Sequence, residues 1–284
     1  MHTPSARPLL LFNNIWVYGN QPISPKPETH FFGHGACIRQ GIKNTITSGM
    51  KRRKTTQQAI NTPMNLADHQ APLLIDGAGG ELLSGQLTVL TGHFGSGKSV
   101  LLRVLAGLLP PTSGDIWLQN EQERLHIDHM PATQWRAKVA LLAQHPQLLT
   151  GSVLENLKLP YTLQAHQYHT FDIDWHIEQL ATLKRHQSLL QQSTAHLSGG
   201  ERQLVNSLRL LQLQPQILLL DEPTAALDQD TTQYFIHWLM HWLQADSSRA
   251  LLWVTHETQA IMPFAHQHWQ MQSGILTTIP TNKQ

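Results

Sequence analysis

The segment from Gly92 to Ser99 combines three glycines with a lysine and a serine, a pattern that suits phosphate binding. It lies between the apolar runs 87–90 and 100–105, so we expect it to join a strand to a helix. The glycines would let backbone N–H groups converge on phosphate oxygens at the positive end of that helix. Lys98 would reach the β- and γ-phosphates, and the Ser99 hydroxyl would bind Mg²⁺. An ordinary glycine turn is the alternative for this segment taken alone. The predicted phosphate-binding residues are Gly92, His93, Phe94, Gly95, Ser96, Gly97, Lys98, Ser99 and Val100.

An apolar run that ends in two carboxylates supplies a second part of such a site. Residues 217–220 are all leucine or isoleucine, and Asp221 and Glu222 follow them. A run that is apolar on both faces suits a central parallel strand, whose carboxyl end is where open α/β sheets bind ligands. We therefore expect Asp221 to hold Mg²⁺ and Glu222 to polarise the attacking water as general base. A buried strand with Asp221 as an acidic helix cap is the alternative.

Further motifs occur in a fixed order along the chain. The segment 197–201, Leu-Ser-Gly-Gly-Glu, resembles the signature motif of the ATP-binding cassette (ABC) ATPases. Gln144 stands where that family has its Q-loop glutamine, and Leu227-Asp228 resembles its D-loop. His256 follows an apolar run and resembles the family's switch histidine. Together with the phosphate-binding loop, or P-loop, these motifs cover residues 66–276.

The resemblance implies a mechanism in which two chains share each nucleotide. ATP held by one P-loop would be closed by the signature motif of a second copy, in a head-to-tail homodimer. Ser198 would donate its hydroxyl, while Gly199 and Gly200 would permit close backbone approach at a helix start. Alternatively Ser198 is an ordinary helix N-cap, and the two roles are compatible.

Three other residues would complete the nucleotide site by the same resemblance. Gln144 would sense the γ-phosphate and contribute to the Mg²⁺ site. His256 would contact the γ-phosphate, and Asp228 of the D-loop would lie near the nucleotide. With Lys98 and Glu222 also present, the catalytic set of the family is complete, which argues against a catalytically inactive member.

The resemblance implies the elements that position these residues. The expected fold is an α/β P-loop NTPase with a mostly parallel core sheet, an antiparallel β edge and an inserted helical subdomain near 145–200. Residues 1–19 resemble the first strand of such domains, and residues 66–284 would form the ABC ATPase domain. The adenine base would stack on Tyr18, or on Trp16 two residues earlier on the same strand face.

Residues 20–65 form an insertion in this interpretation. They carry seven lysines and arginines against one glutamate, a net charge of +6. Few periodic apolar residues occur there, so we expect a mobile loop, either a solvated tether or a segment that meets anionic lipid or nucleic acid. In another interpretation the working domain starts near Met64 and everything before it is dispensable.

Composition limits the class of protein. The 284 residues suffice for one large α/β domain, and the net charge of +1 gives no general attraction to nucleic acid. Cys37 is the single cysteine, which excludes an intramolecular disulfide and suits a reducing cytoplasm. No apolar run approaches the ~20 residues of a membrane-spanning helix, so transport would need a separate membrane subunit.

Local patterns predict further elements. Glycine clusters at 76–80 and 84–85 predict turns between short strands. Helices are expected over 152–159, 176–190, 201–213 and 231–244, strands over 116–118 and 138–143, and a hairpin around Gly274. Asp172 and Asp174 are expected as helix caps. His237 and His241 have a metal-ligand spacing, yet no carboxylate or cysteine completes a site nearby, so a packing or surface role is favoured.

Two function classes follow. The favoured one is the ATP-binding and ATP-hydrolysing subunit of an ABC transporter, peripheral on the cytoplasmic face of the cell membrane and coupled to an integral membrane permease. Residues 144–157 resemble the coupling segment of transporter cassettes, and small bacterial iron-export ATP-binding subunits are the most similar type. The alternative is a soluble ABC ATPase of DNA repair or translation, whose usual coiled coils, zinc modules or paired cassettes we do not find.

Overall fold

The computed structural model describes residues 6–19, 71–120 and 123–280. The chain divides into two units, one of Met1–Gly19 with Pro72–Gln284 and one of Asn20–Ala71. Every element described below belongs to the first unit. The predicted basic insertion at 20–65 and the alternative start near Met64 lie outside the described residues, and the division of the chain at those boundaries stays a prediction.

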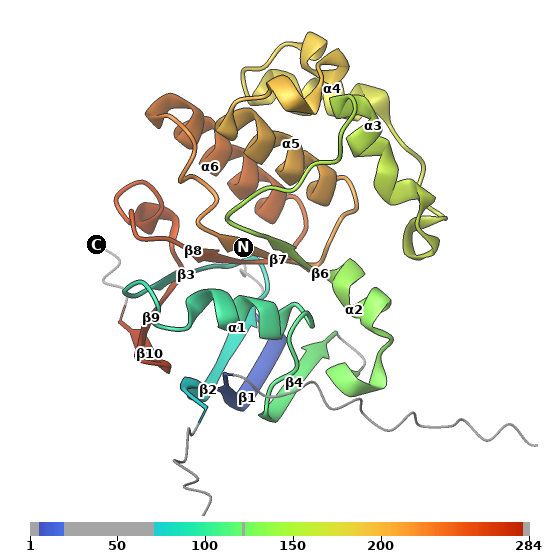
Figure 1. The fold of residues 1–284 in the computed structure, drawn as a ribbon. Helices are drawn as coiled ribbons and strands as arrows, with labels where there is room; N and C mark the ends of the chain where they lie inside the picture. Colours follow the sequence, from blue (N-terminus) through green and yellow to red (C-terminus); the bar gives the residue numbers. More distant parts are fainter. Residues whose placement is uncertain (1–5, 20–70, 121–122, 281–284) are drawn as a thin grey trace, which may run out of the picture. The chain divides into compact units, whose positions relative to one another are not determined.

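The described part of the chain contains both strands and helices, and helices separate the strands β3, β4, β6, β7 and β8 in sequence (Figure 1). The strands are β1 (Pro8–Tyr18), β2 (Leu73–Leu83), β3 (Leu87–Thr91), β4 (Ser113–Gln119), β5 (Arg124–His126), β6 (Val139–Leu142), β7 (Ile217–Asp221), β8 (Ala250–Val254), β9 (Gln267–Gln272) and β10 (Ile275–Ile279). The α-helices are α1 (Lys98–Leu105), α2 (Ala132–Lys138), α3 (Val153–Lys158), α4 (Ile173–Thr182), α5 (Gly199–Leu211) and α6 (Gln229–Gln244). Short 3₁₀ segments join several of them.

The strands form two sheets. The six-stranded sheet has the order β10-β9-β3-β8-β7-β6, with all neighbours parallel except the β9–β10 hairpin. The four-stranded sheet, β2-β1-β4-β5, is antiparallel throughout. A mostly parallel core sheet with an antiparallel β portion and helices is the predicted fold class, which is confirmed.

The central strands β7 and β8 of the six-stranded sheet are buried on both faces, and every residue of these two strands except Asp221 is apolar. Leu218 and Leu220 of β7 belong to one cluster, together with α5 and α6. Ile217 and Leu219 point the other way, into a cluster with α1 and the four-stranded sheet. Figure 1 shows the same layering, with α5 and α6 on one side of β7 and β8 and α1 on the other. Because successive side chains of a strand point to opposite faces of the sheet, each leucine of β7 belongs to one of the two cores.

The turn predicted at 76–80 is wrong, because β2 runs through it without interruption. Gly77 lies at φ 60°, a conformation that non-glycine residues rarely adopt, although a Cβ there would lie at an ordinary 3.5 Å from the Trp16 ring. A Cβ at Gly80 would lie 2.9 Å from Phe12 Cζ and 3.0 Å from the Trp269 ring. These glycines therefore serve close packing and a local irregularity in the β1–β2 pairing, whereas the turn at 84–85 is present as predicted.

The helix predicted at 176–190 is wrong in its bounds. α4 starts earlier, at Ile173, because the Asp172 side chain accepts the Trp175 N–H at 3.0 Å as an N-cap. It ends at Thr182, because Lys184 adopts φ 56° and Arg185 N–H donates to the Leu180 carbonyl at 2.8 Å. That bond is typical of a Schellman motif, here built without glycine.

Most of the other predicted elements are confirmed, with ends within two residues of the prediction except that β4 begins three residues earlier, at Ser113. They are the strands β4 and β6, the helices α3, α5 and α6, and the β9–β10 hairpin around Gly274. Asp174 lies in the first turn of α4 and is not its cap. Among the described residues, no helix is both long enough and apolar enough to span a bilayer.

Candidate nucleotide site

The P-loop joins β3 to α1, which begins at Lys98. Its three glycines all lie at positive φ, 150° at Gly92, 73° at Gly95 and 107° at Gly97, a region that other residues rarely adopt. A Cβ at Gly92 would also lie 2.1 Å from the Met271 carbonyl oxygen. The strand–loop–helix setting that the sequence predicts is therefore present; conformation favours all three glycines, and lack of space adds to this at Gly92 and Gly97.

Lys98 turns back into its own loop. Its Nζ donates to the carbonyl oxygens of Gly92, at 2.7 Å, and His93, at 2.9 Å. The residue is only 6% exposed, and burial lowers the pKa of its ammonium group, while the nearby carboxylates of Glu222 and Asp221 oppose this shift. Among the described residues the ammonium group has no direct carboxylate partner, so an anion at this position would satisfy its charge.

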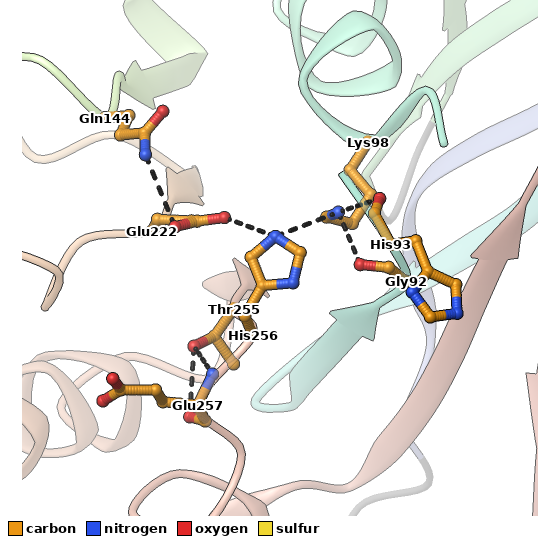
Figure 2. Close-up of polar contacts among 8 residues, drawn as sticks. All are labelled: Gly92, His93, Lys98, Gln144, Glu222, Thr255, His256 and Glu257. Carbon is orange, nitrogen blue, oxygen red and sulfur yellow. Dashed lines mark hydrogen bonds and ion pairs between the residues drawn. The ribbon is translucent and has the colours of Figure 1, made fainter. Parts of the chain in front are cut away.

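Glu222 is the centre of a polar chain at the carboxyl end of β7. One carboxylate oxygen lies 2.8 Å from His256 Nε2 and the other accepts from Gln144 Nε2 at 3.4 Å. The same His256 nitrogen lies 3.4 Å from Lys98 Nζ. The short contact assigns an N–H to Nε2, donated to the carboxylate. Figure 2 shows these four side chains in a row, from Gln144 through Glu222 and His256 to Lys98.

The backbone at Glu222 is held in an unusual conformation. Its φ is 48°, in the left-handed region that non-glycine residues seldom adopt. Its N–H donates to the Val254 carbonyl at 3.0 Å, so the neighbouring strand β8 holds it there. Asp221, one residue earlier, ends β7 opposite Val254 and is only 8% exposed. Such strain is typical of functional sites, and here it sets the direction of the Glu222 side chain.

One contact of this site, between Phe94 and His256, could not be predicted from the sequence. The phenyl ring of Phe94, in the P-loop, stacks on the His256 imidazole with ring centroids 4.6 Å apart and an angle of 11° between the planes. An aromatic residue between the glycines of a phosphate-binding loop was the available signal. The sequence alone predicts only a place for Phe94 in the phosphate-binding loop.

The donor set suits Mg²⁺. Ser99, Asp221 and Gln144, the three predicted ligands, all offer hard oxygen atoms. In the described ranges no cluster of three or more His, Cys, Asp or Glu side chains could hold a metal by itself. An ion with few protein ligands and substrate phosphates as the rest is the usual arrangement for Mg²⁺. The buried Ser96 hydroxyl, which has no protein partner within the described part of the chain, is a further polar group available in this loop.

The signature residues cap a helix. The Ser198 hydroxyl accepts the Glu201 N–H at 3.2 Å, and the Glu201 carboxylate accepts the Ser198 N–H at 2.9 Å. This capping box confirms the N-cap interpretation of Ser198. A Cβ at Gly200 would lie 3.0 Å from the Ala226 carbonyl oxygen, and one at Gly199 would lie 3.5 Å from Ala226 Cβ. The signature therefore packs closely on the segment that leads to the D-loop.

Asp228 has a similar local role, as the N-cap of α6. It accepts the Thr231 N–H at 2.8 Å and the Thr231 hydroxyl at 3.0 Å, and the backbone bond lowers its pKa. The hydrogen bonds of Ser198 and Asp228 are thus made within their own helices. In one chain the structure joins the P-loop with Gln144, Glu222 and His256, and it gives no contact of Ser198 or Asp228 with that group in the described ranges.

Tyr18 and Trp16 differ in their surroundings at the end of β1. Trp16 Nε1 donates to the Asn14 side chain at 2.8 Å, and its ring lies against Gly77. The Tyr18 side chain is 37% exposed.

His237 is the first of the two histidines, His237 and His241, that have the spacing of metal ligands. Its ring contacts the ring of Phe264, as a packing role predicts.

A model of the ABC transporter family matches residues 75–225, just over half of the chain. The chain belongs to the ABC transporter family. The match covers the P-loop, Gln144, the signature motif and β7, which are the parts whose geometry is given above. This ABC cassette is accordingly an ATP-binding, ATP-hydrolysing subunit of the transporter type, as the sequence predicted.

Curated relatives agree with this assignment. The probable iron export ATP-binding protein FetA of Escherichia coli is 33% identical over 180 residues, which cover 63% of this cassette and 76% of FetA. The methionine import ATP-binding protein MetN 1 of Pseudomonas fluorescens is 33% identical over 194 residues, or 68% of this cassette and 57% of MetN 1. The chain thus spans about three quarters of the first relative and just over half of the second. The predicted similarity to iron-export ATP-binding subunits is confirmed.

Solved structures confirm the fold. The dimeric structure of MJ0796, a bacterial ABC transporter cassette, superimposes with a TM-score of 0.69 at 18% identity and covers 96% of this cassette and 99% of that chain. Another is cbiO1 from Clostridium perfringens, part of the ABC transporter complex cbiONQ, with a TM-score of 0.60 at 24% identity over 75% of this cassette and 83% of cbiO1.

Proposed function

We propose that this cassette binds MgATP in the P-loop and hydrolyses it with Glu222 as general base and His256 at the γ-phosphate. The observation that carries the proposal is the polar chain in which Glu222 contacts both Gln144 and His256 beside Lys98. A carboxylate in hydrogen-bond range of two donors, at the open end of a parallel sheet, is placed to orient and deprotonate a water.

Different residues of the site bind the phosphates, the Mg²⁺ ion and the adenine base in this proposal. Lys98 exchanges its bonds to the Gly92 and His93 carbonyls for oxygens of the β- and γ-phosphates, which offset the cost of its burial. Ser99 and Asp221 hold Mg²⁺ together with Gln144. The ion supplies charge neutralisation at the phosphates. Residues 92–97 and Val100 complete the cradle around the phosphates, and Tyr18 stacks on the adenine base.

The tyrosine is preferred over Trp16 for a structural reason. Trp16 already uses its indole N–H on Asn14 and packs along Gly77. Tyr18 ends its strand partly exposed, so one face of its ring can receive a base.

A second copy of the chain completes the site in this proposal. Ser198 is exposed at the start of α5, and its hydroxyl and the two glycines after it form an N-terminal helix end that suits a phosphate. Head-to-tail pairing would bring that end to the P-loop of the partner, with Asp228 close by. The arrangement is a homodimer with two composite sites.

The integral membrane permease is proposed to contact the segment that follows Gln144. Leu149 in this segment is 58% exposed. Its backbone is fixed, because Asn156, 2% exposed, donates to the Leu149 carbonyl at 2.9 Å and accepts its N–H at 2.8 Å. An apolar side chain on a rigid loop next to the γ-phosphate sensor is well placed to bind a partner helix. The cassette would then work on the cytoplasmic face of the membrane, and its permease would select the substrate.

A mixing experiment tests the composite site. Lys98→Ala removes the P-loop function and Ser198→Arg blocks the signature, so each variant alone should lack ATP turnover. A mixed dimer keeps one intact site, formed by the P-loop of one variant and the signature of the other. An equal mixture should therefore recover up to about a quarter of the wild-type rate, because half of random dimers are mixed. Normal turnover by Ser198→Arg alone would rule out the composite site.

The permease contact has its own test. Leu149→Asp should abolish co-purification with the membrane permease, while ATP turnover of the isolated cassette is unchanged. Leu108→Asp is the matched control, since Leu108 is similarly exposed, at 52%, in the loop after α1. Retained co-purification in Leu149→Asp would remove this segment from the permease contact.

A further inference from the structure

Phe94 is an exposed aromatic residue in a loop that otherwise serves phosphate. Its side chain is 81% exposed, so burial of apolar surface does not explain a phenyl ring at this position. One face of the ring stacks on the imidazole of His256, nearly parallel to it. The ring contact spans two loops that are 162 positions apart in sequence. Phe94 therefore has a specific partner, although it belongs to neither hydrophobic core.

The His256 ring is held from its edge and from its face. At the edge, Nε2 lies 2.8 Å from Glu222 and 3.4 Å from Lys98. The hydrogen bond to Glu222 fixes one atom of the imidazole but leaves the tilt of the ring free. Stacking on Phe94 at an angle of 11° removes that freedom. The plane of the imidazole is thus set by the P-loop, while its direction is set by Glu222.

We propose that Phe94 is a positioning residue for His256, through which the P-loop orients the imidazole toward the γ-phosphate. The inference rests on the role of His256 proposed above. The same loop grips the phosphates and supports the face of the ring, so binding of the nucleotide and orientation of the histidine are mechanically linked. A side chain without a flat face would leave His256 hydrogen-bonded but less ordered.

The first test is spectroscopic and independent of turnover. In the full chain, the carbon-bound imidazole protons of His256, assigned with His256→Gln, should be shifted upfield by the ring current of Phe94. Phe94→Leu should move these signals downfield, and Phe94→Tyr should leave them in place. Unchanged His256 signals in Phe94→Leu would overturn the proposal.

The second test separates orientation from phosphate binding. Phe94→Leu should lower kcat about two- to tenfold, the value expected for loss of one aromatic stack, with little change in the KM for ATP. Phe94→Tyr should restore kcat. Tyr168→Leu is the matched control, since Tyr168 is 90% exposed and has no role in the nucleotide site. A rise in KM with unchanged kcat would assign Phe94 to the phosphate cradle instead and overturn the proposal.

A double-mutant cycle links the two residues. In a His256→Ala background, Phe94→Leu should cause no further loss of kcat, because the group it positions is absent. An equal loss in both backgrounds would overturn the inference. If His256→Ala itself keeps wild-type turnover, the proposed role of His256 fails, and with it the positioning role of Phe94. If His256→Ala loses turnover while Phe94→Leu keeps the wild-type kcat, only the inference about Phe94 is overturned.

Discussion

Replacing Glu222 by glutamine removes the carboxylate charge but keeps the length and shape of the side chain. The amide oxygen can still accept from His256 Nε2, which lies at 2.8 Å, and the new NH₂ group faces the weaker contact to Gln144 at 3.4 Å. The Gln144 amide can turn its oxygen toward that group. The substitution exchanges charged for neutral hydrogen bonds, so we expect a stability loss of only about 1–2 kcal/mol.

The effect on turnover should be far larger. General base catalysis typically contributes about 10²–10⁴-fold, which corresponds to about 3–5 kcal/mol of transition-state stabilisation. Glu222→Gln should therefore bind MgATP with the affinity of the wild-type chain, but its rate of phosphate release should fall by about 10²–10⁴-fold. Because ATP is bound and not cleaved, the variant should accumulate as an ATP-bound dimer. Release of inorganic phosphate at saturating ATP and size-exclusion chromatography with and without ATP measure the two outcomes.

Glu257→Gln provides the matched control. Glu257 lies next to His256 and carries the same charge, but Figure 2 shows its carboxylate pointing away from the Glu222–His256 pair. We expect its turnover to be near the wild-type value. A Glu222→Gln variant whose turnover stays within about threefold of wild type would refute the assignment of Glu222 as the base.

Four further predictions follow from the same geometry. Lys98→Ala should abolish ATP binding, measured by nucleotide titration. Tyr18→Ala should weaken ATP binding about tenfold through loss of the stacked base, and unaltered affinity would argue against its adenine role. Burial lowers the pKa of His176, despite its bonds to the Asp172 carbonyl and Gln212, so its protonation favours the unfolded state. The free energy of unfolding should therefore fall as the pH drops below about 6.5, by at most about 1.4 kcal/mol per pH unit, and His176→Gln should flatten this slope in urea titrations. Gly80→Ala should cost about 1–3 kcal/mol because its Cβ meets two buried rings, whereas Gly79→Ala, with ordinary contacts, should cost less in the same assay.

Much of the nucleotide site could be predicted from short sequence patterns. The P-loop, the two carboxylates at the end of β7 and the N-cap at Ser198 all appear where the sequence predicts them. These features depend on residues within one or two turns of each other, because helix caps, glycine conformations and strand burial are local effects. The family assignment rests on the order of such local motifs.

Elements whose ends depend on distant neighbours were predicted poorly. The glycines near Gly80 resembled a turn, yet the rings of Phe12 and Trp269 use the space that they leave. Lys184 gave no sign that it would take a left-handed conformation and end α4. Glycine and lysine at such positions allow several backbone conformations, and the packing around them selects one.

The sequence by itself determined the chemistry that we propose for this cassette: which residues would bind phosphate, hold Mg²⁺ and take a proton. The tertiary structure alone decided which of them meet. Only the order of strands in the six-stranded sheet brings the loop after β8 beside the P-loop after β3, so that His256 stands between Glu222, Lys98 and Phe94. The reason is physical: parallel pairing places the carboxyl ends of distant strands side by side, and no pattern along the chain specifies the stacking of two rings 162 residues apart.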